Sequence, residues 1–207
     1  MNGGGTIYVC PGRYQGGFAL NTAVIVIGAG EGTDVASNTI LDANDLGPVL
    51  HVGTGVGLVE LERLRVTDGS ERGIRHDGTA LRMTECTVSG NTIVDQVGGG
   101  IGVGGGTLEM LRCTVRDNHA TGSTTSFGGG IYTVGTTTLT DCLVEDNRAG
   151  EDGGGLFVSI NAGTCTLAGS TQVRDNAATF GGGIYLGIGT LVIAETCRVM
   201  ENTESPG

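Results

Sequence analysis

The sequence contains no tryptophan and no lysine, and only 3 of its 207 residues are prolines. All 11 of its basic residues are therefore arginines, and 22 acidic residues outnumber them to give a formal net charge of −11. Because an acidic surface repels phosphate groups, we expect neither nucleic acid nor an anionic membrane as a partner. The same charge favours the solubility of a protein with long exposed sheets.

Long apolar runs are also missing. No apolar stretch approaches the roughly 20 residues of a membrane span, so we expect no membrane insertion by this segment. The start of the sequence, residues 1–5, lacks the basic and apolar regions of a signal peptide. The six cysteines form no CxxC pair, which argues against a zinc ribbon or a thioredoxin-type motif.

Two short strings recur in strict alternation through most of the chain. The first is a valine, two variable residues and an asparagine, at 88–91, 115–118, 144–147, 173–176 and 199–202. The second is three glycines followed by an aliphatic residue, at 98–101, 128–131, 153–156 and 181–184. Two markers in a fixed order and at nearly fixed spacing indicate a solenoid.

The segments between the markers are short, rich in β-branched residues and separated by turn residues, without a helical period. They predict an all-β fold, a right-handed, single-stranded parallel β-helix with three strands per coil. About eight coils would form a rod roughly 38 Å long, since neighbouring strands lie about 4.8 Å apart. We expect one β-helix domain over residues 1–207, with irregular coils in 1–46 and repeat coils in 47–207.

The conserved spacing of the markers predicts ladders of identical side chains along the rod. The asparagines should occupy left-handed turn positions and hydrogen-bond from coil to coil. The glycines should supply positive φ and let backbones approach closely at a tight corner. A nucleotide-binding glycine loop is the rival interpretation, but it needs a following helix that the pattern does not predict. The expected asparagine ladder consists of Asn91, Asn118, Asn147, Asn176 and Asn202.

Four cysteines fall two residues before the marker valine, at Cys86, Cys113, Cys142 and Cys197, and Thr171 fills that position in the remaining coil. Residues two apart on a strand face the same way, so these thiols should point inward with the valines. A ladder of buried free thiols is the favoured interpretation. Disulfides between neighbouring coils remain an alternative, because strand spacing lies within the range that a bridge needs.

Two stripes should face outward. Tyr132, Phe157 and Tyr185 each follow the aliphatic residue of a glycine marker, so they should stack on three consecutive coils, flanked by Phe127 and Phe180. Such a stack is either a surface for a glycan or for lateral association, or a ladder of rings that only adds stability.

The second stripe is acidic and precedes the asparagines. Stacked carboxylates repel one another, so something must offset their charge. Arg116, Glu145 and Arg174 alternate in sign beside them and supply part of the compensation. Either the stripe is solvated and structural, or a calcium ion binds it as a cofactor, because hard cations prefer oxygen ligands. The stripe consists of Asp68, Asp117, Asp146, Asp175 and Glu201.

The two marker strings resemble the repeats of polymorphic outer-membrane proteins and related bacterial surface proteins. The opening residues 6–14, Thr-Ile-Tyr-Val-Cys-Pro-Gly-Arg-Tyr, are similar to the first coil of pectate-lyase-like β-helices. Together the resemblances cover nearly the whole chain, and they imply the fold more than an activity, because that superfamily includes adhesins, passenger domains, lyases, hydrolases and phage tail fibres. Members usually begin with a capping helix, which this sequence lacks; we therefore expect an excerpt of, or an open-ended unit in, a longer assembly.

Three functions compete. We favour a non-catalytic extracellular or cell-surface module, such as a stalk, adhesin or passenger rod, which self-associates through its ends or binds a glycan or other cell-surface ligand. A polysaccharide-active lyase or hydrolase is the alternative. Its best candidate cluster is residues 71–77, Glu-Arg-Gly-Ile-Arg-His-Asp, in which Arg75 should point outward and His76 inward. An ice-binding face would need threonines such as Thr136, Thr137 and Thr138 to repeat in register, which the alignment of markers does not predict.

Overall fold

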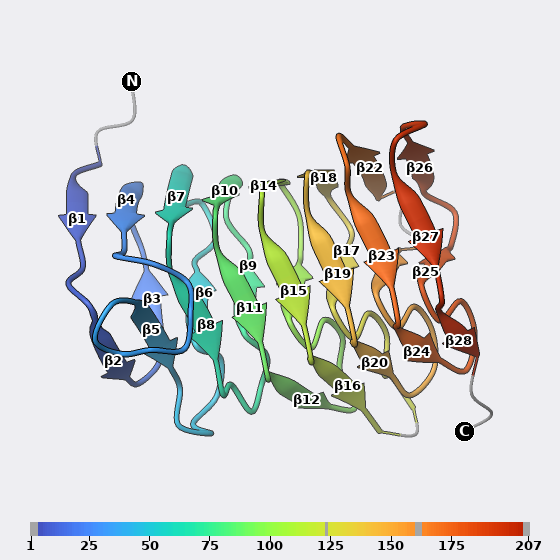
Figure 1. The fold of residues 1–207 in the computed structure, drawn as a ribbon, viewed down its shortest axis with the longest axis horizontal. Helices are drawn as coiled ribbons and strands as arrows, with labels where there is room; N and C mark the ends of the chain where they lie inside the picture. The colour runs from blue at the N-terminus through green and yellow to red at the C-terminus, as the bar shows by residue number, and fades with distance from the viewer. Residues whose placement is uncertain (1–3, 123, 160–162, 205–207) are drawn as a thin grey trace.

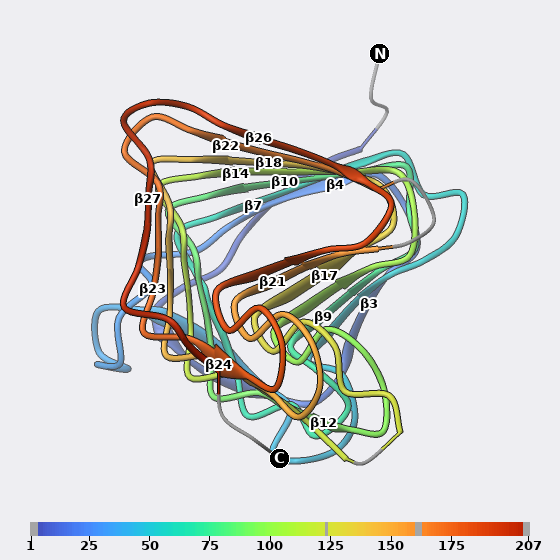
Figure 2. The ribbon, with the colours of Figure 1, turned by 90° about the vertical axis from the view of Figure 1, so that its right-hand side faces the viewer.

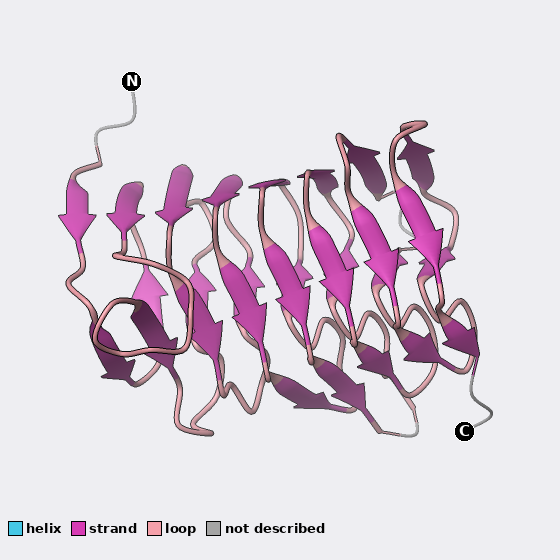
Figure 3. Cartoon of the chain, viewed as in Figure 1, coloured by secondary structure: helices cyan, strands magenta, loops and turns pink. Residues whose placement is uncertain are grey.

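The computed structural model describes residues 4–122, 124–159 and 163–204. In this part of the chain every regular element is a β-strand, and the strands form four parallel sheets that the chain visits in turn (Figures 1 and 3). The fold is a right-handed parallel β-helix. Viewed along its axis, the coils superimpose as a rounded triangle (Figure 2). Over the described residues there is no helix that is long and apolar enough to cross a membrane.

Two sheets of eight strands run the full length of the rod. Sheet A contains, in the order of hydrogen-bonded neighbours, β1 (Thr6–Tyr8), β4 (Val24–Ile27), β7 (Leu58–Glu62), β10 (Ala80–Thr84), β14 (Thr107–Leu111), β18 (Thr136–Thr140), β22 (Thr164–Ala168) and β26 (Thr190–Ile193). Sheet B contains β2 (Gly12–Gln15), β5 (Thr39–Asp42), β8 (Arg65–Thr67), β11 (Thr87–Ser89), β15 (Thr114–Arg116), β19 (Leu143–Glu145), β23 (Gln172–Arg174) and β27 (Arg198–Met200).

The other two sheets complete the coil. Sheet C has seven strands: β3 (Phe18–Leu20), β6 (Leu50–Val52), β9 (Ile74–His76), β13 (Ile101–Val103), β17 (Ile131–Thr133), β21 (Leu156–Val158) and β25 (Ile184–Leu186). Sheet D has five: β12 (Thr92–Val94), β16 (His119–Thr121), β20 (Arg148–Ala149), β24 (Ala177–Ala178) and β28 (Thr203–Glu204). The prediction of three strands per coil was therefore wrong for the later coils. The strands of sheet D directly follow the asparagines of the markers, in segments where the sequence pattern predicted a turn.

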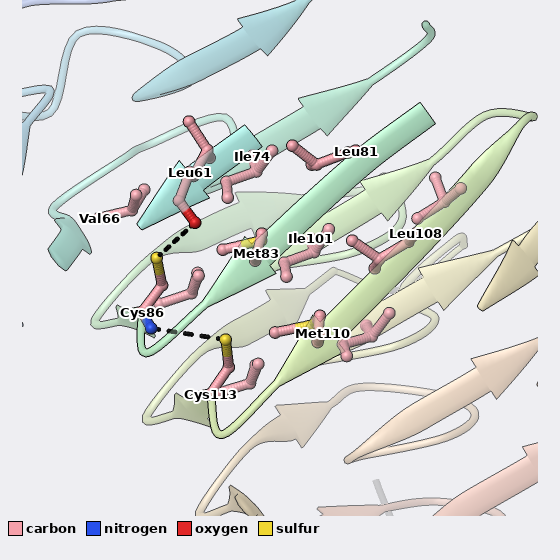
Figure 4. Packing of buried hydrophobic residues seen from close by; sticks show 14 of the residues in the cluster. Leu61, Val66, Ile74, Leu81, Met83, Cys86, Ile101, Leu108, Met110 and Cys113 are labelled. Carbon is pink, nitrogen blue, oxygen red and sulfur yellow. Dashed lines mark hydrogen bonds between the residues drawn. The ribbon is translucent and has the colours of Figure 1, made fainter. Parts of the chain in front are cut away.

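The core is a set of columns in which each inward side chain packs on its counterpart one coil away. Figure 4 shows Leu61, Met83 and Met110, which are paired in register on sheet A and are at most 2% exposed. Each large aliphatic side chain that is buried in this way stabilises the fold by about 1.5–3 kcal/mol relative to an exposed one. Because the next coil completes each layer, burial depends on stacking.

A sulfur column runs beside this aliphatic core. Cys86, Cys113 and Cys142 are buried, and the Cys86 N–H donates to Cys113 Sγ at 3.4 Å (Figure 4). Cys197 is only half-buried, and the six thiols are free. The hydrogen bond with Cys113, followed by burial, raises the pKa of the Cys142 thiol, and burial raises the pKa of Cys165 to about 12. These buried thiols are therefore uncharged at neutral pH and behave as small apolar side chains.

The asparagines form a ladder at the corner between sheets B and D. Asn91 Nδ2 donates to Asn118 Oδ1 at 2.9 Å, and the same contact repeats from Asn118 to Asn147, from Asn147 to Asn176 and from Asn176 to Asn202 at 2.9–3.0 Å. Each accepting Oδ1 also receives the backbone N–H of the asparagine one coil before it. The inner amides of the ladder are at most 1% exposed, so this pairing satisfies groups that water does not reach.

The left-handed residue of this corner is the one before the asparagine, which corrects the prediction. Asp117, Asp146 and Asp175 have φ of 54–55°, whereas no asparagine of the ladder has positive φ. Asp68 and Glu201 share the conformation, and Gly90 fills the same position before Asn91. Aspartate tolerates this conformation better than most residues, because its short polar side chain bonds locally. The left-handed backbone conformation therefore explains why acidic residues recur at this position of the coil.

The three glycines of each triplet have different structural roles. Only the first glycine of each triplet has positive φ, as at Gly98 with φ of 73°. The third glycine lets the chain pass close to the ladder: a Cβ on Gly155 would lie 2.6 Å from the Gly183 carbonyl oxygen and 2.9 Å from Asn176 Nδ2. Both expected roles of the triplet, positive φ and close approach of the backbone, are therefore present, and they belong to different glycines.

His76 is the one histidine in this core. Its side chain is fully buried in a column between Val52 and Val103, and its Nε2 lies 3.0 Å from the Thr107 carbonyl oxygen. Its Nδ1 is buried and has no hydrogen-bond partner among the residues that the structure describes. Burial lowers the pKa of His76, although the Thr107 carbonyl and Asp77 act in the opposite direction. The imidazole is therefore neutral in the folded protein at neutral pH and donates from Nε2.

Replacing Asn147 by alanine should destabilise the fold by about 2–4 kcal/mol, because several buried groups of Asn118, Asn176 and Val115 lose their partners. Urea unfolding followed by circular dichroism measures this. Asp146→Asn, an exposed neighbour that keeps a residue tolerant of positive φ, should change stability by no more than about 0.5 kcal/mol. Equal effects of the two substitutions would contradict the ladder's role.

His76→Val should make stability less sensitive to acid. The unfolded imidazole binds a proton near pH 6.5, whereas the folded one has a lowered pKa. Below about pH 6.5 the unfolded state therefore binds more protons, and stability falls as the pH falls. Urea unfolding at pH 7.5 and pH 5.5 should show a smaller loss in the variant than in the wild type. An identical loss in both proteins would show that His76 does not titrate in this way.

Candidate binding face

The outer face of sheet C carries one outward column that changes character along the rod. The central residue of each strand faces outward while its two neighbours face the core, because side chains alternate along a strand. The register aligns, from the first coil to the last, Ala19, His51, Arg75, Gly102, Tyr132, Phe157 and Tyr185. The early half of the column therefore contains His51 and Arg75, and is called the charged half below. The late half consists of aromatic residues.

The aromatic half is a stack of nearly parallel rings. The centroid of Phe157 lies 5.3 Å from that of Tyr132 and 5.1 Å from that of Tyr185, and Phe127 stacks on it at 4.9 Å. Phe157 is only 5% exposed, whereas both tyrosines are half-buried. Tyr132 Oη lies within hydrogen-bonding distance of Ser159 Oγ, at 3.3 Å. The stack therefore presents two tyrosines to solvent around a covered phenylalanine.

This arrangement departs from the predicted stripe in two ways. Phe157 is enclosed by the neighbouring rings, so it does not offer its face to a ligand. Phe180 does not join the stack. Its side chain is 59% exposed, and its backbone forms an isolated parallel β-bridge with Asp152. Sequence spacing placed these rings in one column, but it did not show which ring the others would cover.

The charged half brings together side chains from two coils. Asp77 Oδ2 accepts from Arg75 Nε at 2.6 Å and lies 3.2 Å from His51 Nε2. Burial by itself would raise the pKa of Asp77, but the hydrogen bond and charge of Arg75, together with His51, hold it below its usual value. Asp77 is therefore a carboxylate that can orient the His51 imidazole.

His51 is the functional candidate that sequence reasoning missed. Residues 71–77 suggested His76 as the titratable partner, yet that imidazole points into the core, as expected, and away from a surface ligand. His51 lies 26 residues from Asp77 along the chain, and only the pairing of β6 with β9 brings the two together. No repeat marker pointed to His51, because it lies in a coil that lacks the two marker strings.

Arg72 fills the gap between the two halves. A Cβ on Gly102 would lie 2.5 Å from Arg72 Nη1, so the guanidinium lies over a position that has no side chain. Arg72 Nη2 donates to Gln96 Oε1 at 3.3 Å and its Nε donates to the Glu71 carbonyl at 3.0 Å. Burial, followed by the charge of Arg75, lowers the pKa of Arg72. Its backbone φ of 113° is rare for a residue other than glycine, and it marks a conformation that the surroundings impose.

The acidic stripe lies at the corner that follows sheet B. Arg116 contacts Asp117 at 2.9 Å, and Arg174 contacts both Glu145 and Asp175. Within the described residues, no group of three or more histidines, cysteines or carboxylates lies close enough to hold a metal ion. The calcium alternative stays a prediction, while the arginines and the left-handed backbone already account for the stripe.

The prediction that the threonines of sheet A are out of register was wrong for Thr136 and in part for Thr138. Thr107, Thr136, Thr164 and Thr190 form one outward column, and Thr138 pairs with Thr166 in the next. Thr137 pairs with Leu108 and Cys165, so it has no threonine neighbour in register, as expected. Glu109 precedes Thr138 and Val192 follows Thr166, so the second column contains only two threonines.

Phe157→Ala should lower stability by about 2–4 kcal/mol, because it removes the covered centre of the ring stack. Tyr185→Ala, at the half-buried edge of the stack, should cost about 1 kcal/mol or less. Urea unfolding of both variants measures the difference. A Tyr185 variant as unstable as the Phe157 variant would show that the stack has no covered centre.

The fold described above also appears in the comparison with known protein families. Residues 22–187 match the family described as the right-handed beta helix region. None of the curated proteins that were compared matches the chain. The matched segment covers most of the repeats and the whole of the face formed by His51, Arg75, Tyr132 and Phe157. The chain belongs to the right-handed β-helix family.

Proposed function

We propose that this chain is a non-catalytic structural module: a rod that extends by stacking coil on coil and presents the outer face of sheet C to a partner. One observation carries the proposal, the state of the outermost coils. Ile193 and Val199 are each 45% exposed, whereas Leu167 and Val173, their counterparts one coil earlier, are fully buried. The last coil thus exposes apolar side chains that would be buried if another coil packed on them.

The first coil has the same character. Ile7 is 50% exposed, although Val26, its partner on the next strand, is 8% exposed. An apolar cavity of about 170 Å³ opens at this end of the rod. It is lined by Ile7, Val9, Tyr14, Phe18, Leu20, Val26, Leu41, Leu50 and Leu61. A further coil, from the same polypeptide or from a second copy, would cover these side chains and pair the free strand edges.

The lateral face supports the second part of the proposal. In the outward column, Tyr132 is the neighbour of Gly102, over which the Arg72 guanidinium lies, and Tyr185 stands two strands further along. Half-exposed rings near a fixed guanidinium suit a glycan or the flank of a second rod. Because the repeats resemble those of polymorphic outer-membrane proteins, we place this module at the cell surface or outside the cell, as a stalk, adhesin or passenger rod. Calcium on the acidic stripe stays a secondary proposal.

A polysaccharide-active enzyme is the second candidate, and the contact of His51 with Asp77 favours it. A carboxylate that orients an imidazole is a common general-base arrangement. Breakdown of a uronate polymer by the wild type, lost in His51→Ala and kept in His76→Val, would favour catalysis over the structural role.

The proposed stacking predicts that the purified protein associates as its concentration rises, because burying the end layers is favourable. Light scattering coupled to size-exclusion chromatography should show the mean mass increasing with concentration. Ile193→Asp, which places a charge in the end layer, should weaken association by about tenfold or more. Val94→Asp, at a 57% exposed lateral position, is the matched control and should associate like the wild type. A constant monomer mass at all concentrations would contradict end-to-end association.

A further inference from the structure

A second surface feature lies on the opposite side of the rod from the aromatic stack, over sheet B. The segment between β4 and β5, residues 28–38, folds across the outside of this sheet (Figures 1 and 2). Thr87 Oγ1 on β11 donates to Glu31 Oε2 at 2.9 Å, a contact between residues 56 apart in the sequence. The loop thereby forms one wall of a groove of about 450 Å³, which is open to solvent.

Arg65 in this groove differs from the other arginines. Six arginines form ion pairs: Arg13, Arg75, Arg82, Arg112, Arg116 and Arg174. Over the described residues, the guanidinium of Arg65 forms no hydrogen bond and no ion pair, although the side chain is half-buried. Arg63, Arg148 and Arg198 have none either, but all three are exposed to water. Within the described residues, Arg65 is the arginine that is partly buried and has neither a side-chain hydrogen bond nor an ion pair. Arg72 is also partly buried without an ion pair, but it donates to Gln96 Oε1 and to the Glu71 carbonyl.

A second guanidinium faces it. Burial lowers the pKa of Arg65 first, and the positive charge of Arg116 lowers it further. Asp68 and Asp117 act against these effects, yet both carboxylates contact other arginines, Arg13 and Arg116 respectively. The remaining acidic groups of the groove are also engaged, since Glu145 pairs with Arg174 and Glu31 accepts from Thr87. Within the described residues, Arg65 therefore has no carboxylate within ion-pair distance.

We propose that this groove binds an oxyanion, a carboxylate or sulfate group, between Arg65 and Arg116, which both line it. One anionic group would reduce the repulsion between the two guanidiniums and accept charge-assisted hydrogen bonds from both. The net charge of −11 disfavours polyanions, so the group belongs to a ligand that carries one negative charge on an otherwise neutral body. This site is independent of the proposed stacking and of the face on sheet C.

Sodium acetate and sodium sulfate serve as probes, each titrated against sodium chloride at constant ionic strength. The side-chain Nε–H resonance of Arg65 in NMR spectra should shift and saturate with at least one of them. The probe that binds more tightly identifies the group as a carboxylate or a sulfate. Sulfate stabilises many proteins without specific binding, so the chemical shift is a better readout than melting temperature alone.

Arg65→Gln should weaken binding of that probe by about tenfold or more, followed through the Arg116 resonance, because it removes charged hydrogen bonds. Arg198→Gln is the matched control, since Arg198 lies on the last strand of sheet B, is exposed and has no ion pair. It should bind like the wild type. The absence of a saturable shift with either probe, or equal affinity in Arg65→Gln and the wild type, would overturn the proposal.

Discussion

The asparagine ladder is the interaction on which the remaining structure depends. Each inner amide is buried at a corner, where it receives two hydrogen bonds from the coil before it and donates to that coil in return. A buried amide that lost these partners would cost more than a typical hydrogen bond contributes, so the coils are held in one register. That register determines which side chains meet in every sheet, because a shift by one residue would turn the inward columns outward.

Much of the fold could be predicted because the ladder and its glycines are repeated in the sequence. The columns of Val115, Cys113 and Asn118 follow from the alternation of side chains once the strands are identified. The left-handed position was misassigned, since asparagine and aspartate both tolerate it and they stand next to each other in Asp117–Asn118. The strands of sheet D were missed because they directly follow the asparagines, where the pattern predicted a turn.

The aromatic stack could be predicted because Tyr132, Phe157 and Tyr185 occupy equivalent positions of the repeat. The other candidate sites were harder to predict, because they join positions that are not equivalent. Arg72 lies over Gly102 from the preceding coil, and His51 reaches Asp77 across another pair of coils. Glu31 reaches Thr87 only because a loop spans the outside of sheet B.

The architecture also separates stability from recognition. Inward columns and corners leave little freedom for substitution, while the outward positions of sheets B and C vary from coil to coil without disturbing the backbone. A rod of this kind can carry an aromatic stack on one side and an arginine groove on another. Each surface remains accessible after further coils stack on the ends, because stacking buries only the end layers.

Residue-resolved amide hydrogen exchange tests the central claim most directly, because it reports how firmly each corner of the rod is held. The account predicts that the backbone N–H groups of Asn118 and Asn147, which donate to the next asparagine, exchange only through global unfolding. Protection should fall toward Asn202 in the last coil. Fast exchange at Asn118 and Asn147, with protected strands on either side, would contradict the claim that this ladder holds the coils in register.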